Sequence, residues 1–230
     1  ALLITVIVLS VIFDFINGFH DAANSIATVV TTKVLTPTQA VIWAAFFNFI
    51  AYFIAVHFLG GFGESIANTV AKTVESEFIT TQVVMAGLIA AITWNLITWW
   101  FGIPSSSSHT LIGGFAGAGI AASGFQAVHL ETVGFIAIFI VAAPLIGMVS
   151  GMIITILTQH VVKKVPSRKA DRWFKGLQLL SSALLSIGHG LNDSQKVIGI
   201  IGALLIANQH FPNLPHWMEM TNMGEMHDWI

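Results

Sequence analysis

Long apolar segments run through most of this chain, and several have the twenty or so residues that a helix needs to cross a lipid bilayer. The sequence is 55% hydrophobic and only 9% charged, with a mean hydropathy of +0.82. A soluble domain has roughly 25% charged residues. We therefore expect an all-α integral membrane protein with long transmembrane helices that crosses the bilayer several times.

Polar breaks divide the chain into apolar segments. The expected segments cover residues 2–32, 39–59, 81–103, 109–125, 132–160 and 174–208. An acidic connection over 60–80 contains Glu64, Glu75 and Glu77, and the polar, Met-rich tail over 211–230 is not expected to span a membrane. The sequence has no cysteine, which excludes disulfides and thiolate metal sites.

Six of the nine basic residues gather between Lys163 and Lys175. A basic cluster between apolar segments usually lies in the cytoplasm, so we expect a cytoplasmic loop over 161–173 in a protein of the plasma or inner membrane. Nucleic-acid binding is disfavoured because the cluster is short and holds only two aromatic residues. Counted outward from this loop, segments 2–32 and 174–208 cross the membrane in opposite directions.

One short pattern occurs in each of those two segments, as GFHDAAN over 18–24 and as GLNDSQK over 190–196. Each copy places an aspartate, Asp21 or Asp193, inside an apolar segment. An ionisable side chain at membrane depth indicates function, and two at matching positions of oppositely directed segments indicate an inverted-repeat transporter. We expect a first repeat over 1–160 and the start of a second over 174–230.

The first motif segment presents a polar helix face. Asp14, Asn17, Asp21 and Asn24 follow one another at offsets of three, four and three, which places them on one side of a helix. Carboxylate and amide oxygens are hard ligands that suit a sodium ion, and the carboxylates could also relay protons. The alternative is that these side chains are hydrogen-bond partners between helices.

The second motif admits two interpretations. Asp193 and Lys196 lie three residues apart and could form an internal pair, or Lys196 could turn toward an anionic substrate. His20, His109 and His189 each lie beside a motif and could relay protons or bind a metal. No histidine pair has the H-E-x-x-H spacing of a zinc site, so we expect no metal other than Na⁺.

A serine-rich turn joins segments 81–103 and 109–125. It carries no Lys or Arg, which favours a re-entrant hairpin over about 81–125 rather than two full spans joined by a cytoplasmic loop. The run after Pro104 reads as a helix N-terminus rich in hydroxyls, which suits an oxyanion, although a capped loop remains the alternative. The hydroxyls belong to Ser105, Ser106, Ser107, Ser108 and Thr110. Asn95, in the first arm, could line the same cavity or bond a neighbouring helix.

Three runs together resemble the inorganic phosphate transporter (PiT) family, and particularly its bacterial low-affinity Pit branch. They are NGFHDAAN over 17–24, WNL over 94–96 leading to GIPSSSSHTLIG over 102–113, and HGLNDSQK over 189–196. The resemblance covers most of the chain. It implies a secondary transporter, not an enzyme, that couples inorganic phosphate to H⁺ or Na⁺ without a cofactor. The transported species could be free phosphate or a metal-phosphate complex. A homodimer is also compatible with the resemblance.

The resemblance also assigns residues. It assigns phosphate oxygens to Ser105, Ser106, Ser107, Ser108 and Thr110, and the coupling cation to Asp21, Asn24, Asn192 and Asp193. The residue patterns add Asp21, Gln195 and Lys196 as candidates for the phosphate, and Asp14 and Asn17 on the polar helix face as candidates for the cation. Family members carry a second Ser/Thr-rich hairpin after the second motif, so we expect these 230 residues to be a fragment without it.

Two other classes compete with the symporter. A passive anion channel or pore would also fit a glycine-rich hairpin with scattered polar residues. An intramembrane enzyme is disfavoured, because the sequence has no nucleophile-elbow or zinc-hydrolase pattern.

Overall fold

In a computed structural model, the chain is described over residues 2–58, 69 and 72–207, and this part is helical. The helices are α1 (Leu2–Thr31), α2 (Pro37–Phe58), α4 (Thr81–Trp100), α5 (Ser107–Ser123), α6 (Leu130–Val162) and α7 (Ser167–Ala207), with short 3-10 turns η1 (Ser76–Phe78) and η2 (Phe125–Ala127). Four of them, α1, α2, α4 and α6, are long and apolar enough to cross a membrane. The expected all-α membrane architecture is confirmed. The predictions for Glu64 and for the tail over 211–230 lie outside the described residues.

A short turn reverses the chain between α1 and α2. Lys33 adopts a left-handed conformation with φ 58°, which ends α1. Thr36 and Gln39 then form a reciprocal cap, in which the Thr36 hydroxyl accepts from the Gln39 N–H (3.4 Å) and the Gln39 side-chain oxygen accepts from the Thr36 N–H (3.0 Å). Pro37 occupies the first helical position, where its missing N–H has no cost. These local signals place the break where the sequence predicted it.

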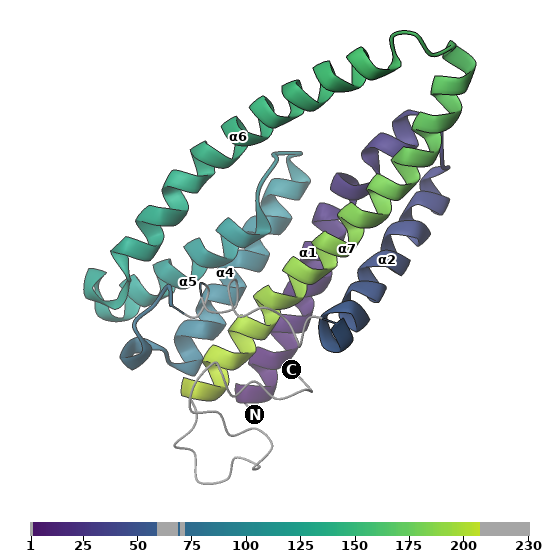
Figure 1. The fold of residues 1–230 in the computed structure, drawn as a ribbon. Coiled ribbons are helices and arrows are strands. Elements are labelled where there is room, and N and C mark those ends of the chain that lie inside the picture. The colour runs from purple at the N-terminus through teal and green to yellow at the C-terminus, as the bar shows by residue number, and fades with distance from the viewer. Residues whose placement is uncertain (1, 59–68, 70–71, 208–230) are drawn as a thin grey trace.

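Helices α1 and α7 lie side by side and antiparallel (Figure 1). The Thr32 hydroxyl donates to the Gln178 side-chain oxygen (2.8 Å) near one end of the pair, and the Lys196 ammonium donates to the Asn17 side-chain oxygen (3.4 Å) farther along. Residue numbers therefore rise along α1 as they fall along α7. This register sets the two motif copies opposite each other in the middle of the bundle.

Helices α4 and α5 form a tight antiparallel hairpin that packs on α1. A Cβ at Gly114 would lie 2.6 Å from the Gly87 carbonyl oxygen, so glycine is what lets these two helices approach. The hydrophobic core formed with α1 and α7 includes Val6, Phe13, Val83, Val84, Leu88, Ala91, Leu111, Phe115, Ile200 and Leu204. In Figure 1 the turn of the hairpin stops short of the upper ends of α1 and α7.

Helix α6 stands apart from the bundle over most of its length (Figure 1). None of its 33 residues is buried, and its large apolar side chains are exposed on every side. A helix that is apolar all round belongs inside a large protein or in lipid. Its length and composition fit a membrane span.

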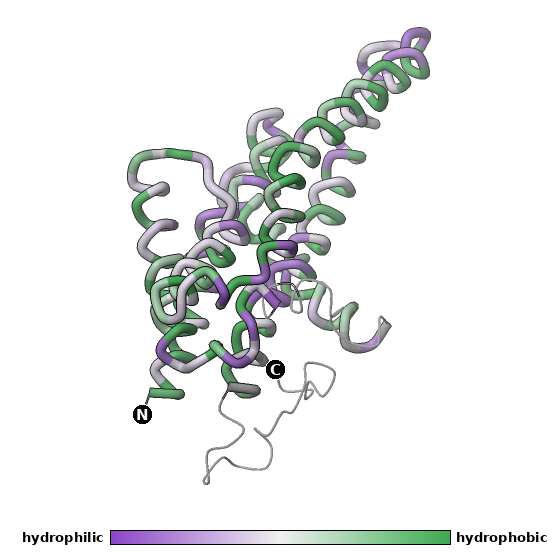
Figure 2. Tube along the Cα trace, turned by 90° about the vertical axis from the view of Figure 1, so that its left-hand side faces the viewer, coloured by the Kyte–Doolittle hydropathy of each residue, from purple (hydrophilic) through white to green (hydrophobic). Residues whose placement is uncertain are grey.

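The basic cluster differs from the expected loop over 161–173, because α7 already begins at Ser167. The carbonyl of Pro166 accepts two backbone N–H groups of the first turn of α7 (2.9 and 3.0 Å), and Lys175 pairs with Asp171 one turn apart (2.9 Å). Lys and Arg are good helix formers, so the helix extends through the basic residues. Figure 2 shows hydrophilic residues gathered at this α6–α7 end.

Candidate functional site

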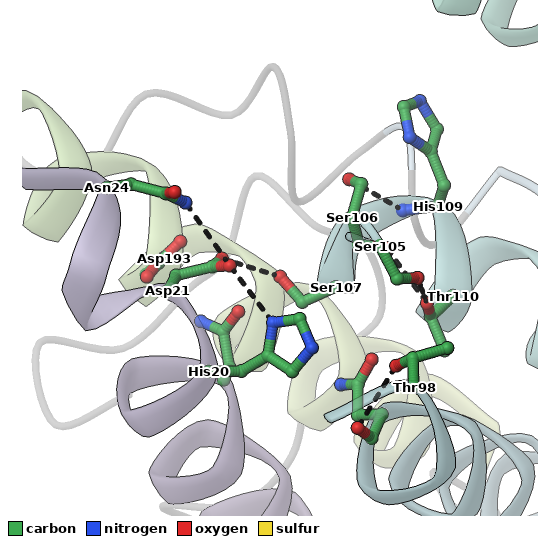
Figure 3. Close-up of polar contacts among 12 residues, drawn as sticks. His20, Asp21, Asn24, Thr98, Ser105, Ser106, Ser107, His109, Thr110 and Asp193 are labelled. Carbon is green, nitrogen blue, oxygen red and sulfur yellow. Dashed lines mark hydrogen bonds and ion pairs between the residues drawn. The ribbon is translucent and has the colours of Figure 1, made fainter. Parts of the chain in front are cut away.

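The N-terminus of α5 meets both motif helices inside the bundle (Figure 3). The Ser107 hydroxyl donates to Asp21 Oδ2 (3.1 Å) and accepts from the Lys196 ammonium (3.1 Å). Lys196 also donates to Asp193 Oδ1 at 2.6 Å. Three segments that are far apart in the sequence thus share one polar cluster. We call it the central cluster, and its members are Asn17, Asp21, Ser107, His189, Asp193 and Lys196.

The two motif aspartates lie close together and are linked by a histidine. His189 Nδ1 lies 3.1 Å from Asp193 Oδ2, and its Nε2 lies 3.9 Å from Asp21 Oδ2. His20 Nδ1 adds a contact of 3.4 Å to Asp21 Oδ1. One ligand atom from each of Asp21, His189 and Asp193 lies within 4.8 Å of the other two, an arrangement that could hold a cation.

Lys196 pairs with Asp193 and also points toward the serine-rich hairpin, so both interpretations of the second motif describe contacts that are present. Its ammonium pairs with Asp193, as an internal bridge would, and it also reaches Ser107 on the hairpin predicted to bind the anion. A third bond goes to Asn17 Oδ1 (3.4 Å). Only 5% of Lys196 is exposed, so nearly the whole side chain is enclosed by α1, α5 and α7.

The polar face of α1 is divided between two environments. Asn17 is 1% exposed and belongs to the central cluster, whereas Asp14 and Asn24 are exposed. Asn24 Nδ2 donates weakly to Asp21 Oδ1 (3.5 Å). Asp14 lines a pocket of about 690 Å³ between α1, α2 and α7, together with Asp193 and a mostly apolar wall. The structure therefore brings Asn17 and Asp21 together and leaves the outer two residues at the edge.

The hairpin hydroxyls also diverge, and of the five only Ser107 contacts the central cluster (Figure 3). Ser106 caps α5 by accepting from the His109 N–H (3.4 Å). Ser105 and Thr110 hydrogen-bond each other (3.3 Å) and line a separate pocket of about 420 Å³. Ser108 is half-buried. Successive positions on a helix are rotated by about 100°, so a run of hydroxyls cannot face one ligand from the helix itself.

The remaining second-motif residues lie around the central cluster. Asn192 is exposed, and no hydrogen bond joins it to that cluster within the described part of the chain. Gln195 is half-buried. Gly190 packs against α2, because a Cβ there would lie 2.8 Å from the Asn48 carbonyl oxygen. The second motif thus supplies two charged residues to the cluster and uses its glycine for helix packing.

Buried side-chain amides on α1, α2 and α4 have polar atoms without a hydrogen-bond partner in the described part of the chain. Asn95 on α4 is fully buried, and neither its side-chain nitrogen nor its side-chain oxygen has a hydrogen-bond partner among the described residues. The side-chain nitrogen of Asn17 is in the same condition. An unpaired buried amide is costly, so these atoms favour a bound ligand or water.

One contact between the motif helices could not be predicted from the sequence. The Ser182 hydroxyl donates to the Ser25 carbonyl (3.0 Å), and isolated serines of this kind are common in apolar helices.

The chain matches the family model described as "Phosphate transporter family" over residues 17–226. Among curated proteins, a probable low-affinity inorganic phosphate transporter of Rhizobium meliloti (strain 1021) is 43% identical, covering 96% of this chain and 65% of that protein. The Bacillus subtilis (strain 168) protein of the same description is 42% identical, with coverages of 97% and 67%. The low-affinity inorganic phosphate transporter PitB of Escherichia coli (strain K12) is 33% identical and is covered over 46% of its length.

A solved structure described as the sodium-dependent phosphate transporter resembles the chain with a TM-score of 0.73. The match covers 95% of this chain and 70% of that one, at 23% sequence identity. The likeness concerns the fold. Like the three curated relatives named above, that protein is longer than this chain.

Proposed function

The chain belongs to the phosphate transporter family, and from this we propose that it forms the phosphate-binding part of a secondary transporter that carries inorganic phosphate across the membrane with a cation. The matched family and relatives are transporters and not enzymes. One observation carries the proposal: Ser107, at the start of α5, lies between a carboxylate and an ammonium group inside the bundle.

We place the phosphate at the central cluster, against the first turn of α5. The N-terminus of a helix offers free backbone N–H groups and the positive end of the helix dipole, both of which attract an oxyanion. The Ser107 hydroxyl and the Lys196 ammonium add side-chain donors at the same place. The unpaired side-chain nitrogen of Asn17, which belongs to the central cluster, is a further donor that a ligand would satisfy.

Asp21 provides selectivity in this scheme. A carboxylate repels an anion, but it accepts a hydrogen bond from a phosphate oxygen that carries a proton. Sulfate at neutral pH has no such proton and would leave Asp21 unpaired against a second negative charge, which is costly. Affinity then comes from the α5 terminus, and discrimination between the two anions comes from Asp21.

The coupling cation, H⁺ or Na⁺, is proposed at the motif aspartates. The close approach of Asp21, His189 and Asp193 supports this assignment, because two neighbouring carboxylates favour a positive charge between them. A cation there would also offset the charge of the phosphate. Binding of both together would be stronger than binding of either alone, which is the requirement for coupled transport.

We further propose that α4 and α5 are a re-entrant hairpin and that α1 and α7 are corresponding helices of an inverted repeat. Their antiparallel course supports the second point, and the hairpin turn that stops within the length of the bundle supports the first (Figure 1). The basic α6–α7 end is assigned to the cytoplasm on charge.

The test is phosphate binding by the purified chain, measured with radiolabelled phosphate in detergent micelles. Ser107→Ala removes a hydroxyl at the charged centre and should weaken binding about tenfold, the effect of one hydrogen bond to a charged group. Ser105→Ala should leave binding within about twofold, because Ser105 faces the other pocket. Thr155→Ala, which removes an exposed hydroxyl from α6, is the matched control.

A large loss of phosphate affinity with Ser105→Ala and none with Ser107→Ala would move the phosphate to the pocket lined by Ser105, His109 and Thr110.

Uptake into vesicles by the complete transporter tests the coupling. Transport that is unchanged after both the H⁺ and Na⁺ gradients are collapsed would favour the passive channel. Sulfate competition should rise in Asp21→Asn if Asp21 is the discriminating residue.

A further inference from the structure

In each motif, the side chain three residues after the aspartate donates a hydrogen bond back to that aspartate. In the first motif it is Asn24, whose amide nitrogen lies 3.5 Å from Asp21 Oδ1. In the second it is Lys196, whose ammonium lies 2.6 Å from Asp193 Oδ1. The two contacts are equivalent in the repeated pattern, but the first donor is neutral and the second is a cation.

The surroundings of the Lys196 ammonium are those of a small cation. Its three acceptors are a carboxylate oxygen of Asp193, the hydroxyl of Ser107 and the amide oxygen of Asn17. They come from three different helices and are all hard oxygen ligands of the kind that bind alkali and alkaline-earth ions. The ammonium is enclosed, since only 6% of the Lys196 side chain is exposed.

Charge compensation differs between the two aspartates. Asp193 has the ammonium of Lys196 at hydrogen-bond distance. Asp21 has the hydroxyl of Ser107, the amide of Asn24 and the rings of His20 and His189, and no Lys or Arg in the described chain contacts it. An acidic group in this setting attracts a mobile positive charge, whereas one already paired with an ammonium does not.

We infer that Lys196 is a tethered counter-cation that occupies the cation site of the second motif. Of the two motif carboxylates, Asp21 is then the one left to bind the mobile coupling cation. The inference rests on the proposed function and makes it more specific: residue 196 sets how many mobile cations accompany each phosphate. Replacing Lys196 with the residue of the first motif should open a second cation site.

The experiment compares Lys196→Asn with the wild-type chain in detergent micelles, in sodium chloride and in choline chloride at equal ionic strength. In choline, the variant should bind radiolabelled inorganic phosphate at least about tenfold more weakly than wild type, because a charge-assisted contact is lost. In sodium, most of that affinity should return, and the gain should exceed the response of wild type to sodium. The thermal unfolding midpoint should rise with sodium more in the variant than in wild type.

Two controls separate charge from shape. Lys175→Asn removes an exposed lysine that is also paired with an aspartate on α7, and it should not change the sodium response. Lys196→Met keeps the aliphatic stem but provides no oxygen ligand, so sodium should restore little. Where Lys196→Asn does not yield folded protein in either salt, Lys196→Gln, whose longer amide reaches Asp193, is used for the same comparison.

Two results would overturn the inference. An equal loss of phosphate affinity in sodium and in choline would show that sodium cannot take the place of the Lys196 ammonium, so the ammonium does not occupy a cation site. Unchanged affinity in choline would show that the ammonium is dispensable. If the wild-type chain binds no phosphate in either salt, the proposed function fails instead, and the sodium dependence of the unfolding midpoint still tests the cation site alone.

Discussion

The two motif copies face each other across α1 and α7, and their aspartates are equally enclosed, with 14% of each side chain exposed. Burial therefore does not distinguish them. The residue three positions later does, because Asn24 leaves the charge of Asp21 in place and Lys196 neutralises that of Asp193. A repeated motif can thus keep its backbone arrangement while its two halves take different electrostatic roles.

The glycines that begin the two motifs differ in the same way. Gly18 has no atom within 4 Å of the position where a Cβ would stand, and it lines the open pocket beside α2. Gly190 lies against the backbone of α2 at Asn48. The glycine of the first copy therefore stands in open space, whereas the glycine of the second packs against a neighbouring helix.

The largest expected loss of stability comes from breaking the ion pair between Asp193 and Lys196. Asp193→Ala leaves the buried ammonium of Lys196 without a carboxylate and should destabilise the chain by about 3–5 kcal/mol, the usual cost of orphaning a buried charge. Asp21→Ala orphans no lysine and should cost about 1–2 kcal/mol, for the hydrogen bond from Ser107. Denaturant unfolding in detergent micelles measures both.

The double variant Asp193→Ala/Lys196→Met controls that result. Removing both charges should recover most of the lost stability, since an apolar pair can replace a buried ion pair. If Asp193→Ala and Asp21→Ala lose equal amounts of unfolding free energy, the Lys196 ammonium neutralises Asp21 as well as Asp193.

An intermediate effect tests the packing difference. Gly190→Ala should destabilise by about 1–3 kcal/mol, because the new methyl group would overlap the Asn48 carbonyl. Gly18→Ala is the matched variant in open space and should be neutral or stabilising by about 0.5–1 kcal/mol through helix propensity. Thermal unfolding curves of the two proteins, compared with wild type, decide the point. A neutral Gly190→Ala would show that α2 can move away from α7.

The smallest effect is expected at Asn24. Its contact with Asp21 is long, at 3.5 Å, and the side chain is exposed, so Asn24→Ala should change stability by less than about 0.5 kcal/mol. Its effect on sodium response is the informative readout, because an amide ligand beside Asp21 would be lost. A stability loss as large as that of Gly190→Ala would indicate a stronger structural role than the geometry shows.

Much of the architecture could be predicted from the sequence. The apolar segments, the break between residues 32 and 39 and the opposite directions of the motif helices follow from hydropathy and charge. The extent of α7 could not, because basic residues that mark a cytoplasmic end are also good helix formers. The motifs were sufficient to identify the family, which the family model and the curated relatives confirm.

The sequence by itself determined the chemical types at the site: two aspartates in apolar helices, a lysine three residues after one of them, and a hydroxyl-rich helix start. Only the tertiary structure decided which of these meet. Ser107 reaches the central cluster while Ser105 and Thr110 turn away, and Lys196 sits between helices that are distant in sequence. Helical spacing fixes the direction of a side chain relative to its own helix, whereas the packing of α1, α5 and α7 determines what lies in that direction.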